Sequence, residues 1–168
     1  MNETYRVGDA LPPLEIPVTR TLIVAGAIAS RDYQDVHHDA ELAREKGSPD
    51  IFMNILTTNG LVGRYITDHF GPAAVLRKVA IRLGAPNYPG DVLRLSGRIV
   101  SLETMALEDV ALENVFLENV FLENVALENV SLEDGNHPLI EVAVVGDNRI
   151  GRHVTGKVTV AITPEGGA

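Results

Sequence analysis

Apolar positions in the central part of the chain predict one amphipathic helix followed by several strands. Within residues 57–70 the apolar side chains recur every three or four positions, which is the spacing of one helical face. These residues are Leu61, Val62, Tyr65, Ile66 and Phe70. Long strands are predicted by segments rich in β-branched residues. These segments are 75–83, 91–102, 139–145 and 153–162.

The boundaries of the helix and the earlier part of the chain give further elements. Thr58 or Asn59 is expected to cap the helix, and Gly71-Pro72 to end it. Residues 40–46 predict a second, short helix with Asp39 as its N-cap.

The first thirty residues predict an arm, a strand and a helical turn. Three prolines within residues 1–17 favour an extended arm, and the β-branched segment 18–24 predicts a first strand. The small residues at 25–29 predict a short turn of helix packed against it. An early strand, one central helix and four later strands are typical of an α+β domain whose curved antiparallel sheet wraps around the helix. At 168 residues and 45% hydrophobic composition, the chain suits a single domain, 1–168.

Residues 101–134 interrupt this pattern with a repeated pentapeptide, of which ALENV and FLENV are examples. A period of five fits no regular element, because it advances about 140° per copy on a helix and reverses face on a strand. Since its removal would leave an ordinary hairpin turn between two strands, we interpret it as a low-complexity insertion. Three forms stay open for it: a disordered or loosely helical excursion, a short solenoid or sheet extension, and a partner-binding module.

The net charge of −9 belongs to this repeat. Residues 101–135 hold nine of the 23 acidic residues and none of the 14 basic ones, so the rest of the chain carries 14 of each. Neither part has the basic surface that nucleic-acid binding requires. The chain has no cysteine, no signal-like amino terminus and no apolar run long enough for a membrane span, so we expect a cytoplasmic protein without a Cys-based site.

Acid–base chemistry is concentrated in one short stretch, RDYQDVHHD at residues 31–39. Asp32 and His37 stand five positions apart in a predicted loop, where both side chains can converge on one water molecule. A carboxylate and an imidazole in that arrangement supply the two proton transfers of an addition to a double bond. On spacing alone a local Asx turn at Asp32 and a helix cap at Asp39 explain the same residues. His38 and His69 are expected at the surface, and no metal site is expected because His37 and His38 are adjacent and lack a third ligand.

A family resemblance favours the catalytic interpretation. The pattern Asp32-x-Gln34-x-x-His37-x-Asp39, followed by Asn59-Gly60-Leu61 opening a helix, resembles the hydratase-2 motif of MaoC-like enoyl-CoA hydratases, D-x-N-P-x-H-x-D and then H-G. Gln34, Asp35 and Asn59 depart from that motif.

Longer stretches resemble a narrower group. RDYQDVHHD, GSPDIFMNILTTNGLVGRYITD and LRLGAPNYPGD are similar to the small MaoC-like subunit of actinobacterial steroid side-chain enoyl-CoA hydratases, which works with a second MaoC-like subunit. The resemblance covers roughly residues 11–100 and resumes after residue 134.

The resemblance implies a hotdog fold and the hydration of an α,β-unsaturated acyl-CoA, with a steroid side-chain thioester as one such substrate. Asp32 and His37 would hold and activate the water, and either one can be the base. Gln34, Asn59 and Gly60 would contact the substrate or orient the loop, with backbone N–H groups near Gly60 facing the thioester oxygen. Close helix–sheet packing is the other explanation for Gly60.

Partners and alternatives follow from the same resemblance. The expected partners are the acyl-CoA substrate and a second hotdog unit, either another copy of this chain or a different MaoC-like subunit. No cofactor is expected, since CoA is part of the substrate. The alternatives are a noncatalytic MaoC-like subunit that scaffolds a partner or binds acyl-CoA, and a hotdog thioesterase.

Overall fold

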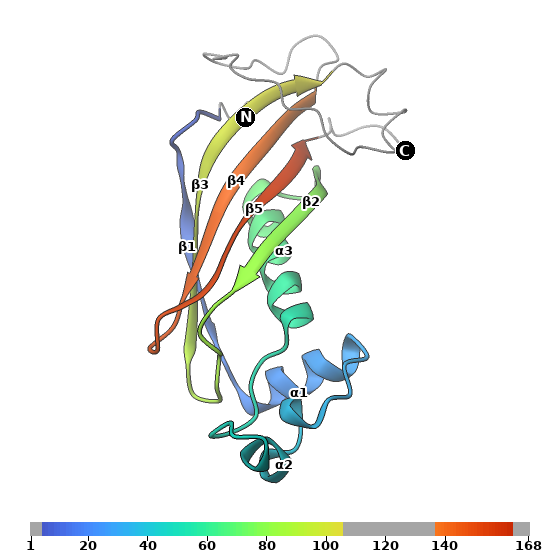
Figure 1. Cartoon of the computed structure of the whole chain (residues 1–168). Helices are drawn as coiled ribbons and strands as arrows, with labels where there is room; N and C mark the ends of the chain where they lie inside the picture. The colour runs from blue at the N-terminus through green and yellow to red at the C-terminus, as the bar shows by residue number, and fades with distance from the viewer. Residues whose placement is uncertain (1–4, 106–136, 163–168) are drawn as a thin grey trace.

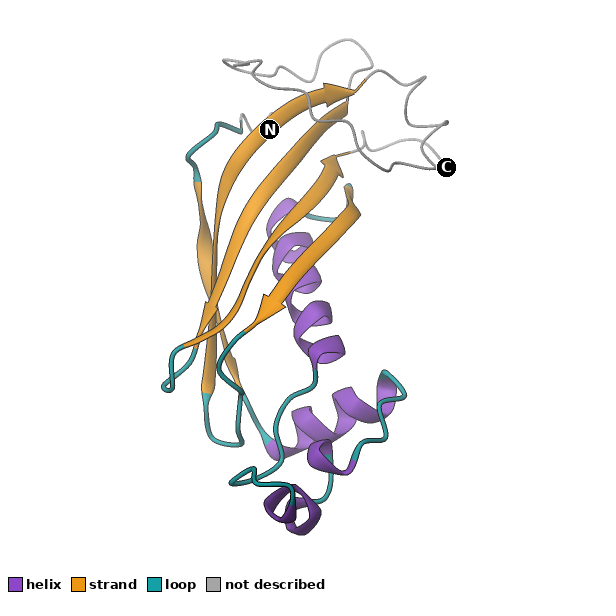
Figure 2. Ribbon diagram, in the orientation of Figure 1, coloured by secondary structure: helices purple, strands orange, loops and turns teal. Residues whose placement is uncertain are grey.

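Five antiparallel strands form one sheet in the order β1-β3-β4-β5-β2. The computed structural model describes residues 5–105 and 137–162. The strands are β1 (Ala10–Pro17), β2 (Ala74–Leu83), β3 (Val92–Met105), β4 (His137–Asp147) and β5 (Arg152–Ile162). The sheet curves around the long helix α3 (Ile55–Phe70), while the shorter helices lie beyond one end of α3 (Figures 1 and 2). The predicted α+β arrangement, a curved sheet around one central helix, is confirmed.

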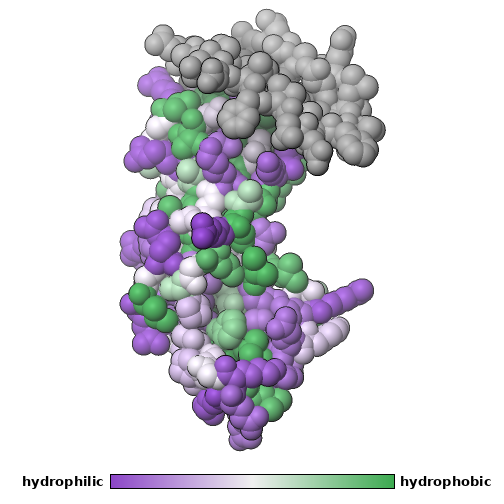
Figure 3. Space-filling view, viewed as in Figure 1, coloured by the Kyte–Doolittle hydropathy of each residue, from purple (hydrophilic) through white to green (hydrophobic). Residues whose placement is uncertain are grey.

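Helix α3 packs the apolar face that the sequence predicted against the sheet. Val62, Tyr65 and Ile66 are buried, as are the β3 and β4 side chains that face the helix, such as Leu95 and Val142. Burying a large apolar side chain contributes about 1.5–3 kcal/mol, so this layer is the main stabilising element. At the surface, hydrophobic side chains appear on the middle of one face, between the sheet and the end of the molecule that the shorter helices form (Figure 3).

The start of α3 corrects the sequence interpretation. The helix begins at Ile55, two residues before the predicted start, and its N-cap is Asn54 rather than Thr58 or Asn59. The side-chain oxygen of Asn54 accepts a hydrogen bond from the Thr57 N–H at 2.9 Å, which satisfies one of the free donors of the first turn. Asn59 and Gly60 therefore lie in the second turn and do not open the helix. Its end at Gly71, with φ of 79°, is as predicted.

Residues 18–24, predicted as a strand, belong mostly to a helix. Helix α1 (Arg20–Ala29) begins after Thr19, whose hydroxyl accepts from the Leu22 N–H at 3.0 Å. It buries Ile23 and Ala27, four positions apart on one face. At Gly26 an added Cβ would lie 2.2 Å from the Thr57 hydroxyl oxygen, so α1 and α3 cross closely. This packing outweighs the local β preference of the segment.

The predicted extended arm contains the edge strand β1. It pairs with β3 from Ala10↔Arg98 to Pro17↔Val92, and its register shifts between Leu11 and Leu14, where Pro12 and Pro13 lie. A proline has no N–H to donate, but it is tolerated at a bulge of an edge strand. The prolines are therefore compatible with a strand at this position, because β1 lies at the edge of the sheet.

The remaining short elements lie between α1 and α3. The 3-10 turn η1 (Asp35–His37) precedes α2 (Ala40–Glu45), whose N-cap is Asp39 as predicted. One Asp39 oxygen accepts from the backbone N–H groups of Glu41 and Leu42 at 2.9 and 3.1 Å. Within the described residues no helix is long and apolar enough to cross a membrane.

Residues 101–105, predicted as the first copy of the repeat, continue strand β3, whereas 106–134 lie outside the described residues. Met105 and His137 are register partners at the adjoining ends of β3 and β4, so a short turn can connect them.

We expect deletion of residues 106–130 to leave a folded domain, with a melting temperature within about 5 °C of the parent, because surface loop length has a small effect on stability. Circular dichroism and size-exclusion chromatography test this, and an aggregated deletion variant would mean that the repeat contributes to the core.

Candidate active site

The loop between α1 and α2 carries Asp32 on a sharp turn. The N–H groups of Arg31 and Asp32 donate to the carbonyls of Ile28 and Ala27 at 3.0 and 2.9 Å, so the chain folds back over the end of α1. Arg31 has φ of 57°, a conformation that is uncommon for a residue with a side chain. This backbone places Asp32 beside the end of α1, next to the start of α3.

Asp32 and His37 are brought together as the spacing predicted. The Asp32 Oδ2 atom lies 3.3 Å from His37 Nε2, and the two side chains are 14% and 7% exposed. His37 Nδ1 donates to the Phe52 carbonyl at 2.7 Å, and the imidazole packs edge-on against the Phe52 ring at 5.0 Å. Since Nδ1 is held by the backbone, Nε2 is the nitrogen that remains for proton exchange.

Hydrogen bonds hold Asp32 in its charged form. The Asn54 side-chain amide donates to Asp32 Oδ2 at 3.0 Å and is the main cause that lowers the pKa of this carboxyl group; the Gln34 backbone N–H and the nearby His37 lower it further, against the effect of burial. Asp32 is therefore a carboxylate at neutral pH. Gln34 contributes this backbone N–H, 3.4 Å from Asp32 Oδ1, while its side chain is exposed.

Gly60 is not explained by packing within the described residues. An added Cβ there would meet nothing within 4 Å, in contrast to Gly63, where it would lie 3.2 Å from a Leu76 methyl group. Gly60 is exposed, and the neighbouring Asn59 is half-buried with an Oδ1 that has no hydrogen-bond partner in the described part of the chain. Both residues thus retain free space or free hydrogen-bonding capacity.

The first turn of α3 also has unused donors. An α-helix leaves its first N–H groups without helical partners. Asn54 accepts from those of Thr57 and Thr58, whereas the N–H groups of Ile55 and Leu56 have no acceptor among residues 5–105 and 137–162. Ile55 and Leu56 are each 49% exposed. Apolar surface and two backbone donors therefore follow directly after the residue that holds Asp32.

Three contributors to this arrangement were missed from the sequence. Asn54 binds Asp32, Phe52 holds His37 through its carbonyl, and Ser30 accepts from Asn54 at 2.9 Å. A lone asparagine in the apolar segment 51–56 was the available signal, because a polar residue buried there needs specific partners. A carbonyl contact such as that of Phe52 has no signal in the sequence.

A second buried imidazole lies behind the site. His153 Nδ1 donates to the Ala85 carbonyl at 2.6 Å, and Nε2 lies 2.9 Å from the Thr58 hydroxyl, which also reaches the Asn54 carbonyl at 3.3 Å. Burial is the main cause that lowers the pKa of His153 from its ordinary value of 6.5.

His153 should make the fold sensitive to acid. Its pKa is lower in the folded state than in the unfolded state, so its contribution is full above pH 6.5 and is lost as pH falls through that value toward the folded pKa. The slope of the unfolding free energy can reach about 1.4 kcal/mol per pH unit in that window. Urea unfolding between pH 7.5 and 5 measures it, with His153→Gln as the variant that should flatten the slope. An equal slope in the variant would assign the acid sensitivity to another group.

His38 and His69 are exposed, as expected. No group of three His, Asp or Glu side chains suitable for a metal ion occurs in the described ranges.

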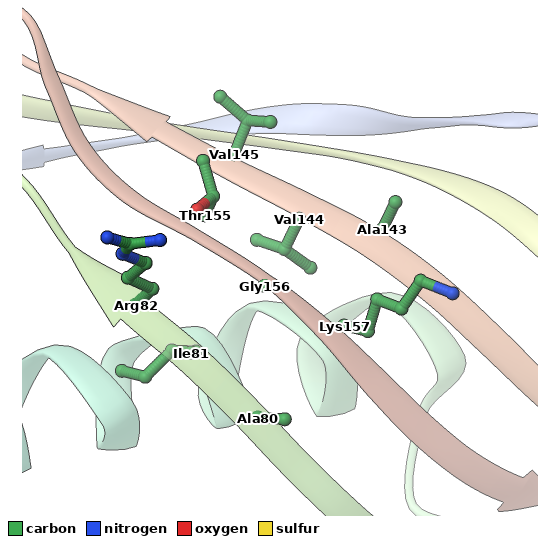
Figure 4. Close-up of a pocket in the computed structure, with 9 residues that line it drawn as sticks. All are labelled: Ala80, Ile81, Arg82, Ala143, Val144, Val145, Thr155, Gly156 and Lys157. Atoms are coloured by element: carbon green, nitrogen blue, oxygen red, sulfur yellow. The ribbon is translucent and has the colours of Figure 1, made fainter.

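A shallow hollow of 560 Å³ lies over β2, β4 and β5 (Figure 4). Its lining consists of Ala80, Ile81, Arg82, Ala143, Val144, Val145, Thr155, Gly156 and Lys157. None of these belongs to the Asp32–His37 region, so this hollow is a separate feature.

Known proteins resemble this chain in sequence and in structure. Residues 5–120 match the model of the MaoC like domain. The chain is 38% identical over 156 residues to the 3-oxo-4,17-pregnadiene-20-carboxyl-CoA hydratase beta subunit of Mycobacterium tuberculosis, covering 93% of this chain and 95% of that protein.

Two solved structures extend the comparison. The ChsH1–ChsH2 complex from Mycobacterium tuberculosis matches with a TM-score of 0.70 and 38% identity over 94% of this chain and 98% of that one. The R-hydratase PhaJ1 from Pseudomonas aeruginosa matches with a TM-score of 0.68 at 16% identity, covering 96% of this chain and 84% of that one, which is a likeness of fold.

Proposed function

The chain belongs to the MaoC-like domain family and has the hotdog fold, and from this premise we propose that it is an enoyl-CoA hydratase. It adds water across the double bond of an α,β-unsaturated acyl-CoA thioester. The observation that carries the proposal is the 3.3 Å approach of Asp32 Oδ2 to His37 Nε2, with His37 Nδ1 held by the Phe52 carbonyl. The pair offers one proton acceptor and one proton donor at a single place, as hydration requires.

Asp32 is the base in the proposed reaction, because its pKa is lowered chiefly by the Asn54 amide and it starts as a carboxylate. It accepts a proton from water while the water oxygen bonds to the β-carbon. The imidazolium of His37 gives its Nε2 proton to the α-carbon, which leaves Asp32 protonated and His37 neutral. Transfer of the proton from Asp32 Oδ2 to His37 Nε2 over 3.3 Å restores the starting state. Protons and charge balance over the cycle.

The thioester oxygen gains negative charge in this reaction and needs donors aimed at it. The N–H groups of Ile55 and Leu56, which have no acceptor in the described part of the chain, lie at the positive end of α3, and the open space at Gly60 leaves room beside the same helix. Asn59 and Gly60 remain proposed contacts of the substrate, and Gln34 a proposed orienting residue of the loop through its N–H.

A bulky apolar acyl group suits the surroundings of the pair. Ile28 and Tyr33 are 54% and 66% exposed, and Ile55 and Leu56 are each 49% exposed. All four stand within a few positions of Asp32 or Asn54 in the chain. A steroid side-chain CoA thioester is therefore the proposed substrate class, in line with the name of the mycobacterial relative. CoA enters as part of the substrate and no separate cofactor is proposed.

A second MaoC-like subunit is the proposed partner, with a homodimer as the form in its absence. The mycobacterial relative is a beta subunit, and the matching structure is a complex of two chains. Strand β2 is an edge strand with mostly exposed residues, so it offers backbone groups for pairing. The cytoplasm remains the expected location.

The decisive experiment compares the chain alone with the chain co-purified with a second MaoC-like subunit. Each preparation is given a short-chain and a steroidal enoyl-CoA, and the product is followed by mass spectrometry together with a thiol assay. The mass of the product should exceed that of the substrate by one water, without release of free thiol. Turnover should be fastest with the steroidal substrate. Release of CoA thiol instead would mark a thioesterase, and no turnover by either preparation would favour a noncatalytic binding subunit.

A further inference from the structure

Asn54 joins three parts of the molecule through one buried side chain. It is 2% exposed and lies between the end of α1 and the start of α3. Its Oδ1 accepts from the Thr57 N–H at 2.9 Å, while Nδ2 donates to Ser30 Oγ at 2.9 Å and to Asp32 Oδ2 at 3.0 Å. Both amide protons and the amide oxygen are thus used.

The surrounding donors fix the orientation of this amide. The Thr57 N–H can only donate, so it requires the oxygen of Asn54 on its side. The Ser30 hydroxyl donates to the Gly26 carbonyl at 2.8 Å and therefore accepts from Asn54. Nδ2 must then face Asp32, and the carboxylate receives an N–H from it rather than a second oxygen. A flipped amide would place two acceptors against each other at Asp32.

The Asp32 carboxylate has no equally short contact elsewhere among the described residues. Its other oxygen accepts from the Gln34 N–H at 3.4 Å, and Oδ2 lies 3.3 Å from His37 Nε2. Asn54 Nδ2 lies 3.0 Å from Asp32 Oδ2, and the same side chain caps the start of α3. The position of the carboxylate relative to His37 is therefore set by α3 as well as by the loop that carries Asp32.

We propose that Asn54 is a positioning residue for the hydration reaction: it ties the start of α3 to Asp32 and keeps that carboxylate aligned with His37 Nε2. The inference rests on the proposed function for its kinetic consequences. Its structural content, the control of Asp32 by Asn54, stands independently of the substrate.

Two substitutions separate this role from helix capping. Serine and aspartate cap helices about as well as asparagine, so Asn54→Ser and Asn54→Asp should both retain α3. Asn54→Ser removes the donor to Asp32, and Asn54→Asp places a second carboxyl group against it. Thr19→Ala is the matched control, since it removes the cap of α1 without touching Asp32.

The first measurement is the titration of the Asp32 carboxyl carbon by NMR in the full-length protein without substrate. We expect the midpoint to rise by about one pH unit in Asn54→Asp, which is tenfold in the protonation equilibrium, and by less in Asn54→Ser. Thr19→Ala should leave it unchanged. An unchanged midpoint in both Asn54 variants would overturn the proposal, whether or not the wild-type protein is a hydratase.

The second measurement is the pH dependence of kcat and KM with the enoyl-CoA substrate. We expect kcat to fall about tenfold or more in both variants with KM within about twofold, because alignment of the proton-transfer groups is lost while substrate contacts remain. In Asn54→Asp the acid limb of the kcat profile should move to higher pH. A change in KM with kcat unaltered would show that Asn54 has a merely structural role. An equal fall of kcat in Thr19→Ala would show the same. If the wild-type protein does not hydrate enoyl-CoA, the proposed function fails, and the NMR titration still decides the role of Asn54.

Discussion

Replacing His37 by Asn is expected to lower kcat for hydration by about 10²- to 10⁴-fold, the usual contribution of a general acid or base. The asparagine amide can still donate to the Phe52 carbonyl, which His37 Nδ1 reaches at 2.7 Å in the parent. What is lost is Nε2, the atom 3.3 Å from Asp32, which in the proposed reaction protonates the α-carbon. Steady-state kinetics on the enoyl-CoA substrate measure the effect, and a thermal melt verifies the fold.

The neighbouring histidine supplies the matched control for this prediction. His38 is exposed, and its Nε2 contacts the Tyr33 carbonyl at 3.2 Å, away from the Asp32 carboxylate. His38→Asn should therefore leave kcat within about twofold of the parent. An active His37 variant together with an inactive His38 variant would mean that the motif has been assigned to the wrong imidazole.

Replacing Asp32 by Asn should reduce kcat by a similar factor of about 10²- to 10⁴-fold through loss of the water-activating carboxylate. The amide has nearly the same shape, and its oxygen can keep the contact with the Asn54 amide, 3.0 Å away in the parent. KM should change little, because Asp32 is proposed to act on water and not to bind CoA.

The pH profile distinguishes the proposed direction of proton transfer from its reverse. If Asp32 is the base, the part of the profile that Asp32 controls is a loss of activity at acid pH, below the ordinary value of 3.8, because the Asn54 amide in particular lowers the pKa of this group. A parent enzyme that requires protonated Asp32 would instead lose activity as pH rises from that range toward neutrality. The second profile would reverse the acid and base roles of Asp32 and His37.

The sequence was most informative where periodicity and chemistry agreed over many residues. The repeated apolar face of 57–70 and the four β-branched segments were sufficient for the helix and four of the five strands. The Asp32–His37 pair was found because two complementary proton-transfer groups lie close in the chain. These local patterns predicted the structure correctly because the tertiary contacts favour the same elements that the local sequence favours.

The errors arose where tertiary contacts outweighed local preference. The segment 18–24 has β-branched residues, yet the close crossing at Gly26 and the burial of Ile23 and Ala27 favour a helix. Asn54 was overlooked because its partners, Ser30 and Asp32, stand more than twenty positions away. A hydrogen bond across that separation has no periodic signature, so only the folded chain reveals it.

The two edge strands of the sheet differ in their proline content. β1 carries Pro12 and Pro13 at its register shift and ends at Pro17, so a further strand laid along it would find donors missing and the ladder displaced. β2, at the opposite edge, contains no proline. In the proposed assembly, two sheets joined through their β2 edges would each leave a proline-bearing β1 at the outer edge. The prolines of β1 would then hinder the addition of further strands, which opposes the growth of fibrils.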